Sequence, residues 1–207
     1  MILIVCPAYS ETGGPESLHM LYQFLNKKRL DVSMFYFNLK DNNVNPVPKK
    51  YDKYDVRWVT SLDDKQDNVI IFPEVYAHKA LGFKKADVYI WWLSYDNYYN
   101  FGVDKNRVLG INFKRIIKLN FKFPLRLIMH LKLIKNTRIR HLAGTHYVKF
   151  ELEKLGIEKI DFLNQTMVWQ PFFKQFLYGV LHSVIYRASI VERPMQSMMV
   201  EPVNVII

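Results

Sequence analysis

The chain has 207 residues, of which 50% are hydrophobic and 15% aromatic, and its formal net charge is +10. This composition is sufficient for a packed core and excludes a globally disordered chain. The single cysteine, Cys6, excludes a disulfide framework and is typical of a reducing cytoplasm. The apolar run at the amino terminus is too short for a secretory signal peptide and has no basic residues before it.

The first predicted unit is a strand, a glycine-containing loop and a helix. Residues 2–7 form a nearly unbroken apolar run, which predicts a strand buried on both faces of a parallel sheet. A polar loop with Gly13 and Gly14 follows, and apolar residues then recur at helical spacing over residues 16–28. Such a loop directs backbone N–H groups and the positive end of the helix dipole at an anion, most commonly a phosphate. The alternative is a tight turn that needs glycine only for backbone freedom.

Further along the chain, short apolar runs alternate with amphipathic segments. Strands are predicted at residues 32–38, 57–59, 69–73, 87–93 and 141–145. Helices are predicted at residues 74–83, 124–135 and 147–156, and a polar, aromatic loop is predicted at residues 94–100. This alternation predicts an α/β fold, a Rossmann-like doubly wound domain with a mostly parallel sheet, over residues 1–165. Residues 166–207 lose the periodicity, which predicts an irregular or helical tail.

The strand, the Gly-Gly-Pro-Glu loop and the helix of residues 2–28 resemble the amino-terminal edge of GT-B glycosyltransferases. The similarity is to the retaining, nucleotide-sugar-dependent group of bacterial polysaccharide synthesis. In that group the Gly-Gly turn after the first strand approaches the donor diphosphate and the acceptor, and the matching residues here are Gly13, Gly14 and Glu16. The G-x-G-x-x-G and G-x-x-x-x-G-K-[ST] fingerprints are absent.

The resemblance extends over residues 1–165, which corresponds to one Rossmann-like half of a GT-B fold. A complete GT-B enzyme has a second half of similar size, which binds the donor and carries acidic residues spaced as Glu-x7-Glu. Residues 166–207 contain no such pair and are too few for that half. The resemblance therefore implies the acceptor-side domain of a truncated enzyme. We expect the isolated chain to have little or no sugar-transfer activity.

Candidate site residues lie in segments that follow predicted strands, because ligands of doubly wound folds bind at the carboxyl ends of strands. Glu74 and His78 are the catalytic candidates, since helical geometry would place them on one face and let the carboxylate orient the imidazole. The alternative is an ordinary solvated pair. Tyr95, Asp96 and Asn97 are candidate substrate-binding residues after strand 87–93, with packing against the core as the alternative.

A basic segment from residue 105 to residue 149 contains twelve Lys and Arg residues and no Asp or Glu. Its cationic residues are interleaved with Ile, Leu, Met and Phe, which is typical of a helix on an anionic membrane surface. The predicted membrane-surface residues are Lys114, Arg115, Lys118, Lys122, Arg126, Lys132 and Lys135. Nucleic-acid binding is the alternative. The absence of an RNP, zinc-finger or KH pattern argues against it.

The sequence thus predicts a glycosyltransferase, or a remnant of one, that transfers a sugar from a nucleotide-sugar donor to a polysaccharide or lipid-linked acceptor. One alternative is a non-catalytic subunit of a split glycosyltransferase, in which a second protein supplies the donor domain; the other is a basic membrane- or nucleic-acid-binding protein. The expected location is cytoplasmic and peripheral on the inner face of the membrane. We expect no cofactor and no protein-held metal, because His141 and His146 have no third ligand at suitable spacing.

Overall fold

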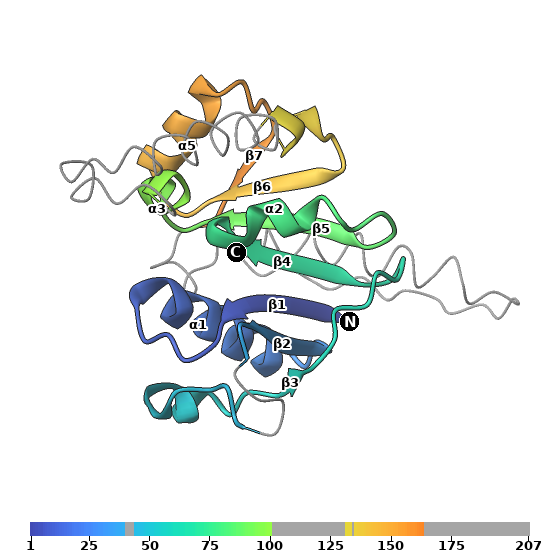
Figure 1. The fold of residues 1–207 in the computed structure, drawn as a ribbon, viewed down its shortest axis with the longest axis vertical. Coiled ribbons are helices and arrows are strands. Elements are labelled where there is room, and N and C mark those ends of the chain that lie inside the picture. Colours follow the sequence, from blue (N-terminus) through green and yellow to red (C-terminus); the bar gives the residue numbers. More distant parts are fainter. Residues whose placement is uncertain (40–43, 101–130, 134, 164–207) are drawn as a thin grey trace, which may run out of the picture.

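A computed structural model of the chain describes residues 1–39, 44–100, 131–133 and 135–163 (Figure 1). The strands are β1 (Ile2–Pro7), β2 (Val32–Phe37), β3 (Trp58–Val59), β4 (Val69–Pro73), β5 (Asp87–Trp92), β6 (Ile139–Ala143) and β7 (Ile160–Phe162). The helices are α1 (Gly13–Lys27), α2 (Ala77–Ala80), α3 (Tyr95–Asn100) and α5 (His146–Lys154), with two 3₁₀ segments, η1 (Lys49–Tyr54) and η2 (Glu74–Tyr76).

The seven strands form one sheet in the order β3-β2-β1-β4-β5-β6-β7, and every neighbouring pair is parallel. β1 lies between β2 and β4, with Ile2 in register with Val32 on one side and Val69 on the other. The chain therefore moves outward from β1 to β3, and then returns across β1 to build the other half from β4 to β7. This arrangement confirms the predicted α/β, Rossmann-like doubly wound fold.

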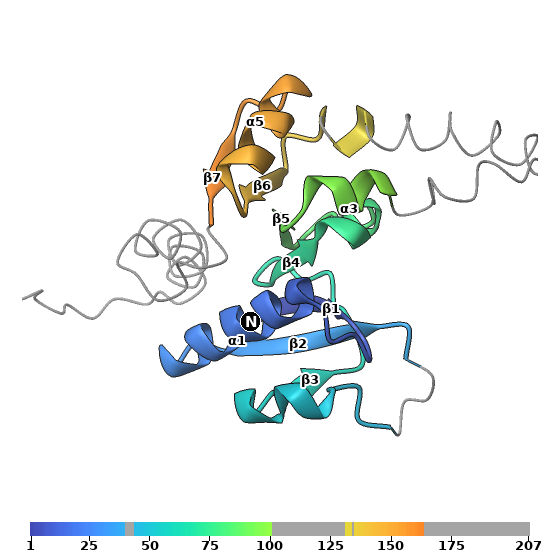
Figure 2. The ribbon, with the colours of Figure 1, turned by 90° about the vertical axis from the view of Figure 1, so that its left-hand side faces the viewer.

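Alternating residues of the strands pack into two separate cores, one on each face of the sheet. Ile2, Ile4 and Cys6 of β1 join the core beneath α1, whereas Leu3 and Val5 join the core beneath α2 and α5. Because both faces of β1 are covered, all these side chains must be apolar, which explains the unbroken run in the sequence. Figure 2 shows α1 on one side of the sheet and α2 and α3 on the other.

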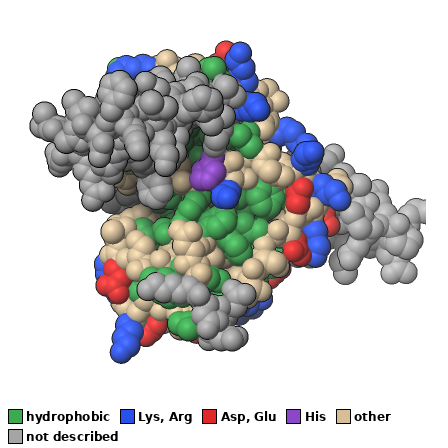
Figure 3. All heavy atoms as spheres, in the orientation of Figure 1, with side chains coloured by type: hydrophobic (Ala, Val, Ile, Leu, Met, Phe, Trp, Pro, Cys, Tyr) green, Lys and Arg blue, Asp and Glu red, His purple; other side chains and the backbone are tan. Residues whose placement is uncertain are grey.

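The face that carries α2 is less completely covered over the first half of the sheet. Phe35, Phe37 and Val59 on this face are only partly buried, and the connection from β3 to β4, residues 60–68, contains no helix. Figure 3 shows the resulting stretch of hydrophobic surface across the middle of this face.

One carboxylate fastens the β3–β4 connection to the second half of the sheet. Asp64 accepts hydrogen bonds from three consecutive backbone amides, those of Lys84 (2.9 Å), Lys85 (2.9 Å) and Ala86 (2.8 Å). These residues immediately precede β5. The bond from Ala86 is the main reason why the pKa of Asp64 lies below its ordinary value, so the carboxylate is charged at neutral pH.

Several predicted boundaries differ from the structure. The helix expected at residues 16–28 begins at Gly13, so its first turn contains both glycines. The helix expected at residues 74–83 is a 3₁₀ turn followed by the single turn of α2. The loop expected at residues 94–100 contains α3, whose start is marked by a hydrogen bond from the Asn97 amide to Ser94 Oγ (3.3 Å).

Two differences concern the end of the domain. β6 begins two residues before the predicted strand at 141–145 and ends at Ala143, because Gly144 and Thr145 lead into α5. β7 was not predicted, since a strand of three residues with an exposed Asp161 has no clear apolar pattern. Of the helix predicted at residues 124–135, only 131–133 and 135 are described, and they are helical. The tail predicted for residues 166–207 lies outside the described residues.

Candidate functional site

The candidate site lies where the strand order reverses, between the carboxyl ends of β1 and β4. In open α/β sheets this switch point leaves a crevice, because the connections from the two neighbouring strands run to opposite faces. α1 starts after β1 with Gly13, and η2 starts directly after β4 with Glu74. Figure 2 views the sheet from this edge and shows the start of α1 beside the end of β4. The topology therefore brings the Gly13–Gly14 turn and Glu74, both singled out by the sequence, to one edge.

The fold itself has no need for glycine in the Gly13–Gly14 turn. Neither glycine has a positive φ, so backbone freedom does not explain them. In the described part of the chain, leaving aside the helix's own backbone, a Cβ at Gly13 would meet nothing within 4 Å, and a Cβ at Gly14 would meet only Leu93 Cδ1, at an ordinary 3.6 Å. The interpretation of this segment as a tight turn that needs glycine is therefore wrong. The missing side chains instead leave open space in front of the first turn of α1.

The amino terminus of α1 is not capped by its own N-cap side chain. The N-cap residue is Thr12, a residue type that commonly accepts a hydrogen bond from the first turn, but its side chain makes no such bond. The first backbone bond of the helix runs from the Glu16 amide to the Thr12 carbonyl (3.2 Å). The amides of Gly13 and Gly14 lie before that bond, at the positive end of the helix dipole. This arrangement suits an anion.

A buried polar network holds the first turn of α1 in place. His19 lies wholly within the protein, where Nδ1 donates to the Pro15 carbonyl (2.6 Å) and Nε2 accepts from the Tyr36 hydroxyl (2.8 Å). The imidazole stacks on Tyr51, whose hydroxyl donates to the Thr12 carbonyl (3.1 Å). Burial lowers the pKa of His19, so the ring is neutral, as this bonding pattern requires. The turn is thereby fixed to β2 and to η1.

Glu16, the third residue taken from the family resemblance, contacts η1. Its carboxylate pairs with the Lys50 ammonium (2.9 Å) and the Lys53 ammonium (3.7 Å). The hydrogen bond from Lys50 is the main cause that lowers the pKa of Glu16. Both ion pairs are partly exposed, so each contributes little to stability. The structure therefore places Glu16 in the same helical turn as the glycines, with its carboxylate engaged by two lysines.

Glu74 is almost completely buried, with an exposed fraction of 3%. Its Oε2 accepts a hydrogen bond from the Leu93 amide (3.0 Å), one residue beyond the end of β5. Burial raises the pKa of Glu74 to about 7, although hydrogen bonds from the amides of Leu93 and Ser94 and from the Asn97 side chain oppose that rise. The carboxyl group thus changes charge near neutral pH and links the ends of two neighbouring strands.

The expected pair of Glu74 and His78 is not formed. His78 is exposed on α2, and in the described part of the chain no hydrogen bond or ion pair joins it to Glu74. The reason is that residues 74–76 form a 3₁₀ turn, in which residues four apart no longer lie above one another. Partial burial and the neighbouring Lys79 lower the pKa of His78, so the imidazole is neutral at pH 7.

The three residues predicted after β5 all lie in the first turn of α3. Tyr95 is half-buried, with its ring edge-on to Tyr147 at a centroid distance of 6.4 Å. Asp96 and Asn97 are exposed. The turn packs on β5 through Tyr98, whose ring contacts Trp92 at 4.9 Å. The structure therefore brings Asn97 to Glu74 and leaves Asp96 at the surface of the same edge.

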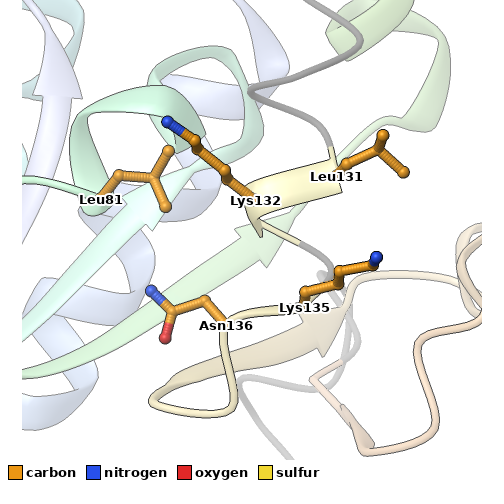
Figure 4. A pocket seen from close by; sticks show the side chains of 5 residues that line it. All are labelled: Leu81, Leu131, Lys132, Lys135 and Asn136. Atoms are coloured by element: carbon orange, nitrogen blue, oxygen red, sulfur yellow. The ribbon is translucent and has the colours of Figure 1, made fainter.

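Only two of the predicted membrane-surface residues lie in the described part of the chain. Lys132 and Lys135 border an open hollow of about 620 Å³, together with Leu81, Leu131 and Asn136 (Figure 4). The two ammonium groups point in different directions in this view, so they do not converge on one point. The other five residues, Lys114, Arg115, Lys118, Lys122 and Arg126, lie outside the described residues.

Sequence reasoning missed the contacts that hold the site together, namely those of His19 and the bond from Leu93 to Glu74. A histidine within an amphipathic helix has no pattern that distinguishes a network member from a surface residue. A carboxylate that accepts from a backbone amide likewise leaves no sequence spacing. The one usable signal was Glu74 itself, an acidic residue directly after a strand buried along its whole length.

Comparisons with protein families, with curated proteins and with solved structures give no significant match to this chain. In residues 1–39, 44–100, 131–133 and 135–163, no helix has both the length and the apolar character needed to cross a membrane. Within the same ranges, no three His, Cys, Asp or Glu side chains gather closely enough to hold a metal ion.

Proposed function

We propose that the chain is the acceptor-side half of a nucleotide-sugar-dependent glycosyltransferase of the GT-B type, and that a diphosphate contacts its Gly13–Gly14 turn. The observation that carries this proposal is the pair of glycines at the start of α1, where neither backbone conformation nor crowding requires them. At a switch point, space in front of uncapped helix amides is what a phosphate group uses. The strand-loop-helix resemblance supplies the class of reaction.

The turn offers a small number of bonds to a ligand. Each hydrogen bond from an amide to a charged oxygen is worth about 1.5–3 kcal/mol. Sugar transfer needs more, because the donor sugar must be aligned with the acceptor and the leaving diphosphate stabilised as its charge develops. The described residues form one Rossmann-like half, so we expect weak nucleotide binding and little transfer by this chain alone. A donor domain, whichever polypeptide carries it, would complete the site.

Titration with UDP and with UDP-glucose, followed by calorimetry or NMR, tests the binding step. We expect millimolar to submillimolar affinity for the parent protein and at least a tenfold loss for Gly13→Val, whose side chain enters the open space. Gly82→Ala is the control, because its Cβ would also make only an ordinary contact, 3.4 Å from the Lys79 carbonyl. Equal affinity of the parent and Gly13→Val for UDP, or no binding by the parent, would overturn the proposal.

A peripheral position on an anionic membrane is part of this proposal. It is supported by Lys132 and Lys135 beside Leu131, a leucine with an exposed fraction of 44%. Each Lys or Arg near an anionic surface contributes about 1 kcal/mol, an attraction that salt screens. Sedimentation with phosphatidylglycerol vesicles should show binding at low salt that is lost at high salt. Equal binding to neutral vesicles would contradict an electrostatic attachment.

A further inference from the structure

The ends of β4 and β5 are joined by the buried Glu74 carboxylate. Its Oε2 accepts from the Leu93 amide at 3.0 Å, and the exposed fraction of the residue is 3%. A carboxyl group buried to this degree is costly unless hydrogen bonds compensate it. An apolar side chain of the same size would pack here at lower cost, so packing alone does not explain an acid at this position.

The bonded amide belongs to a residue that faces the glycine turn. Among the described residues, and apart from the chain neighbours and the helix backbone, the atom within 4 Å of the position that a Cβ at Gly14 would take is Leu93 Cδ1, at 3.6 Å. The next residue, Ser94, receives the Asn97 amide on its Oγ and so starts α3. Fixing Leu93 therefore fixes two things at once: the wall opposite the Gly13–Gly14 turn, and the place at which α3 begins.

We propose that Glu74 is a positioning residue, whose carboxylate holds Leu93 and the first turn of α3 against the Gly13–Gly14 turn and so sets the width of the diphosphate site. The part of this inference that concerns a ligand rests on the proposed function. The part that concerns the link between β4 and α3 does not, since it depends only on the hydrogen bond to Leu93.

Two substitutions distinguish the role of the hydrogen-bond acceptor in Glu74 from the role of its charge. Glu74→Gln keeps an oxygen that accepts from the Leu93 amide, whereas Glu74→Leu keeps the approximate volume and removes the acceptor. If Glu74 serves packing alone, Leu is the better replacement and the 93–97 segment is unchanged. If it positions the segment, Gln substitutes for Glu and Leu does not.

Amide hydrogen exchange by NMR, on the full chain, tests the link. We expect exchange of the amides of residues 93–97 to be at least tenfold faster in Glu74→Leu and within twofold of the parent in Glu74→Gln. Asp64→Asn is the matched control, because it weakens another carboxylate–amide link, at the entry to β5, and should speed exchange of residues 93–97 by no more than its loss of global stability explains. In the parent itself the Leu93 amide must be protected, a measurement that requires no variant to fold. Rapid exchange of that amide, or equal exchange in Glu74→Leu and the parent, overturns the proposal.

UDP titration of the same variants tests the effect on the site. We expect a loss of at least fivefold in affinity for Glu74→Leu, measured well below its melting temperature, and little change for Glu74→Gln. Unchanged affinity in a Glu74→Leu protein that binds UDP would show that the link does not set the site. If the parent binds no UDP, the proposed function fails, and the exchange rates alone decide whether Glu74 holds residues 93–97.

Discussion

The β1–α1 unit and the β6–α5 unit each contain a buried histidine and a helix with threonine at its N-cap, but they use these residues in opposite ways. In β1–α1, both nitrogens of His19 are hydrogen-bonded, and the Thr12 side chain leaves the helix uncapped. In β6–α5, Thr145 Oγ1 accepts from the Val148 amide (3.1 Å), so the helix is capped. His141, however, has one hydrogen-bond partner among the described residues, the Trp92 indole, which donates to Nδ1 (3.0 Å).

The two units also differ in where their polar groups without a protein partner lie. In β6–α5 the group is His141 Nε2, which is buried and has no hydrogen-bond partner among the described residues. In β1–α1 the groups without a side-chain cap lie at Gly13, which is exposed. Water satisfies them there without cost, and a ligand can replace that water. Of these two units, β1–α1 therefore combines a fully hydrogen-bonded histidine with a helix end that the N-cap side chain leaves open.

The largest expected effect comes from removing His19. His19→Leu would leave the Tyr36 hydroxyl buried without a partner, which costs about 1–3 kcal/mol, and would remove the ring stacking on Tyr51, worth about 0.5–1.5 kcal/mol, so we expect a loss of about 3 kcal/mol. Urea unfolding measures the change. Adding Tyr36→Phe should restore part of it by removing one orphaned group. A loss below about 1 kcal/mol would show that the network does not hold the turn.

Protonation of His141 at low pH should also reduce the free energy of unfolding, by a smaller amount. Burial lowers the pKa of His141 to about 4, whereas an unfolded histidine titrates near 6.5. The stability that depends on the neutral ring is present above pH ~6.5 and is lost as pH falls toward ~4. The loss is at most about 3 kcal/mol.

Glu74 has the opposite pH dependence over an overlapping range. Its pKa is raised to about 7, above the ordinary value of about 4.3, so the folded protein gains stability as pH falls from ~7 to ~4.3. The two contributions oppose each other in the parent. Compared with the parent, urea unfolding between pH ~7.5 and ~4.5 should therefore show stability that falls more steeply in Glu74→Gln and less steeply in His141→Gln. Identical profiles for both variants would contradict these assignments.

The smallest expected effect compares the two threonine caps directly. Thr145→Ala removes the side-chain bond to the Val148 amide and should cost about 1 kcal/mol. Thr12→Ala removes no such bond and should change the free energy of unfolding by less than about 0.5 kcal/mol. Thermal unfolding of the two variants side by side makes the measurement. Equal losses would mean that Thr12 caps α1 in solution and that the helix end is less open than described.

The sequence predicted those parts of the fold that depend on burial. β1, β4 and β5 are covered on both faces, so an unbroken apolar run was sufficient to locate them. The position of the Gly13–Gly14 turn followed from the strand before it and the helix after it. β7 escaped prediction because a short edge strand needs no continuous apolar run.

The interior of the candidate site was less predictable than its location. Glu74 was correctly placed at the carboxyl end of a strand, but one of its partners is the backbone amide of residue 93, which any residue other than proline would provide. The predicted pairing with His78 failed because it assumed α-helical spacing through a segment that begins as a 3₁₀ turn. Topology and burial can be inferred from residue types, whereas a bond from side chain to backbone depends on the three-dimensional path of the chain.

The bond of Asp64 to three successive amides has a consequence for how the molecule comes apart. Residues 60–68 connect the first half of the sheet to the second. Asp64, near the middle of this connection, accepts hydrogen bonds from the segment that leads into β5. Unfolding of β3 would therefore disturb the start of β5, and unfolding of β5 would release residues 60–68. These bonds link the two halves of the sheet, and we expect the sheet to unfold in one cooperative transition instead of half by half.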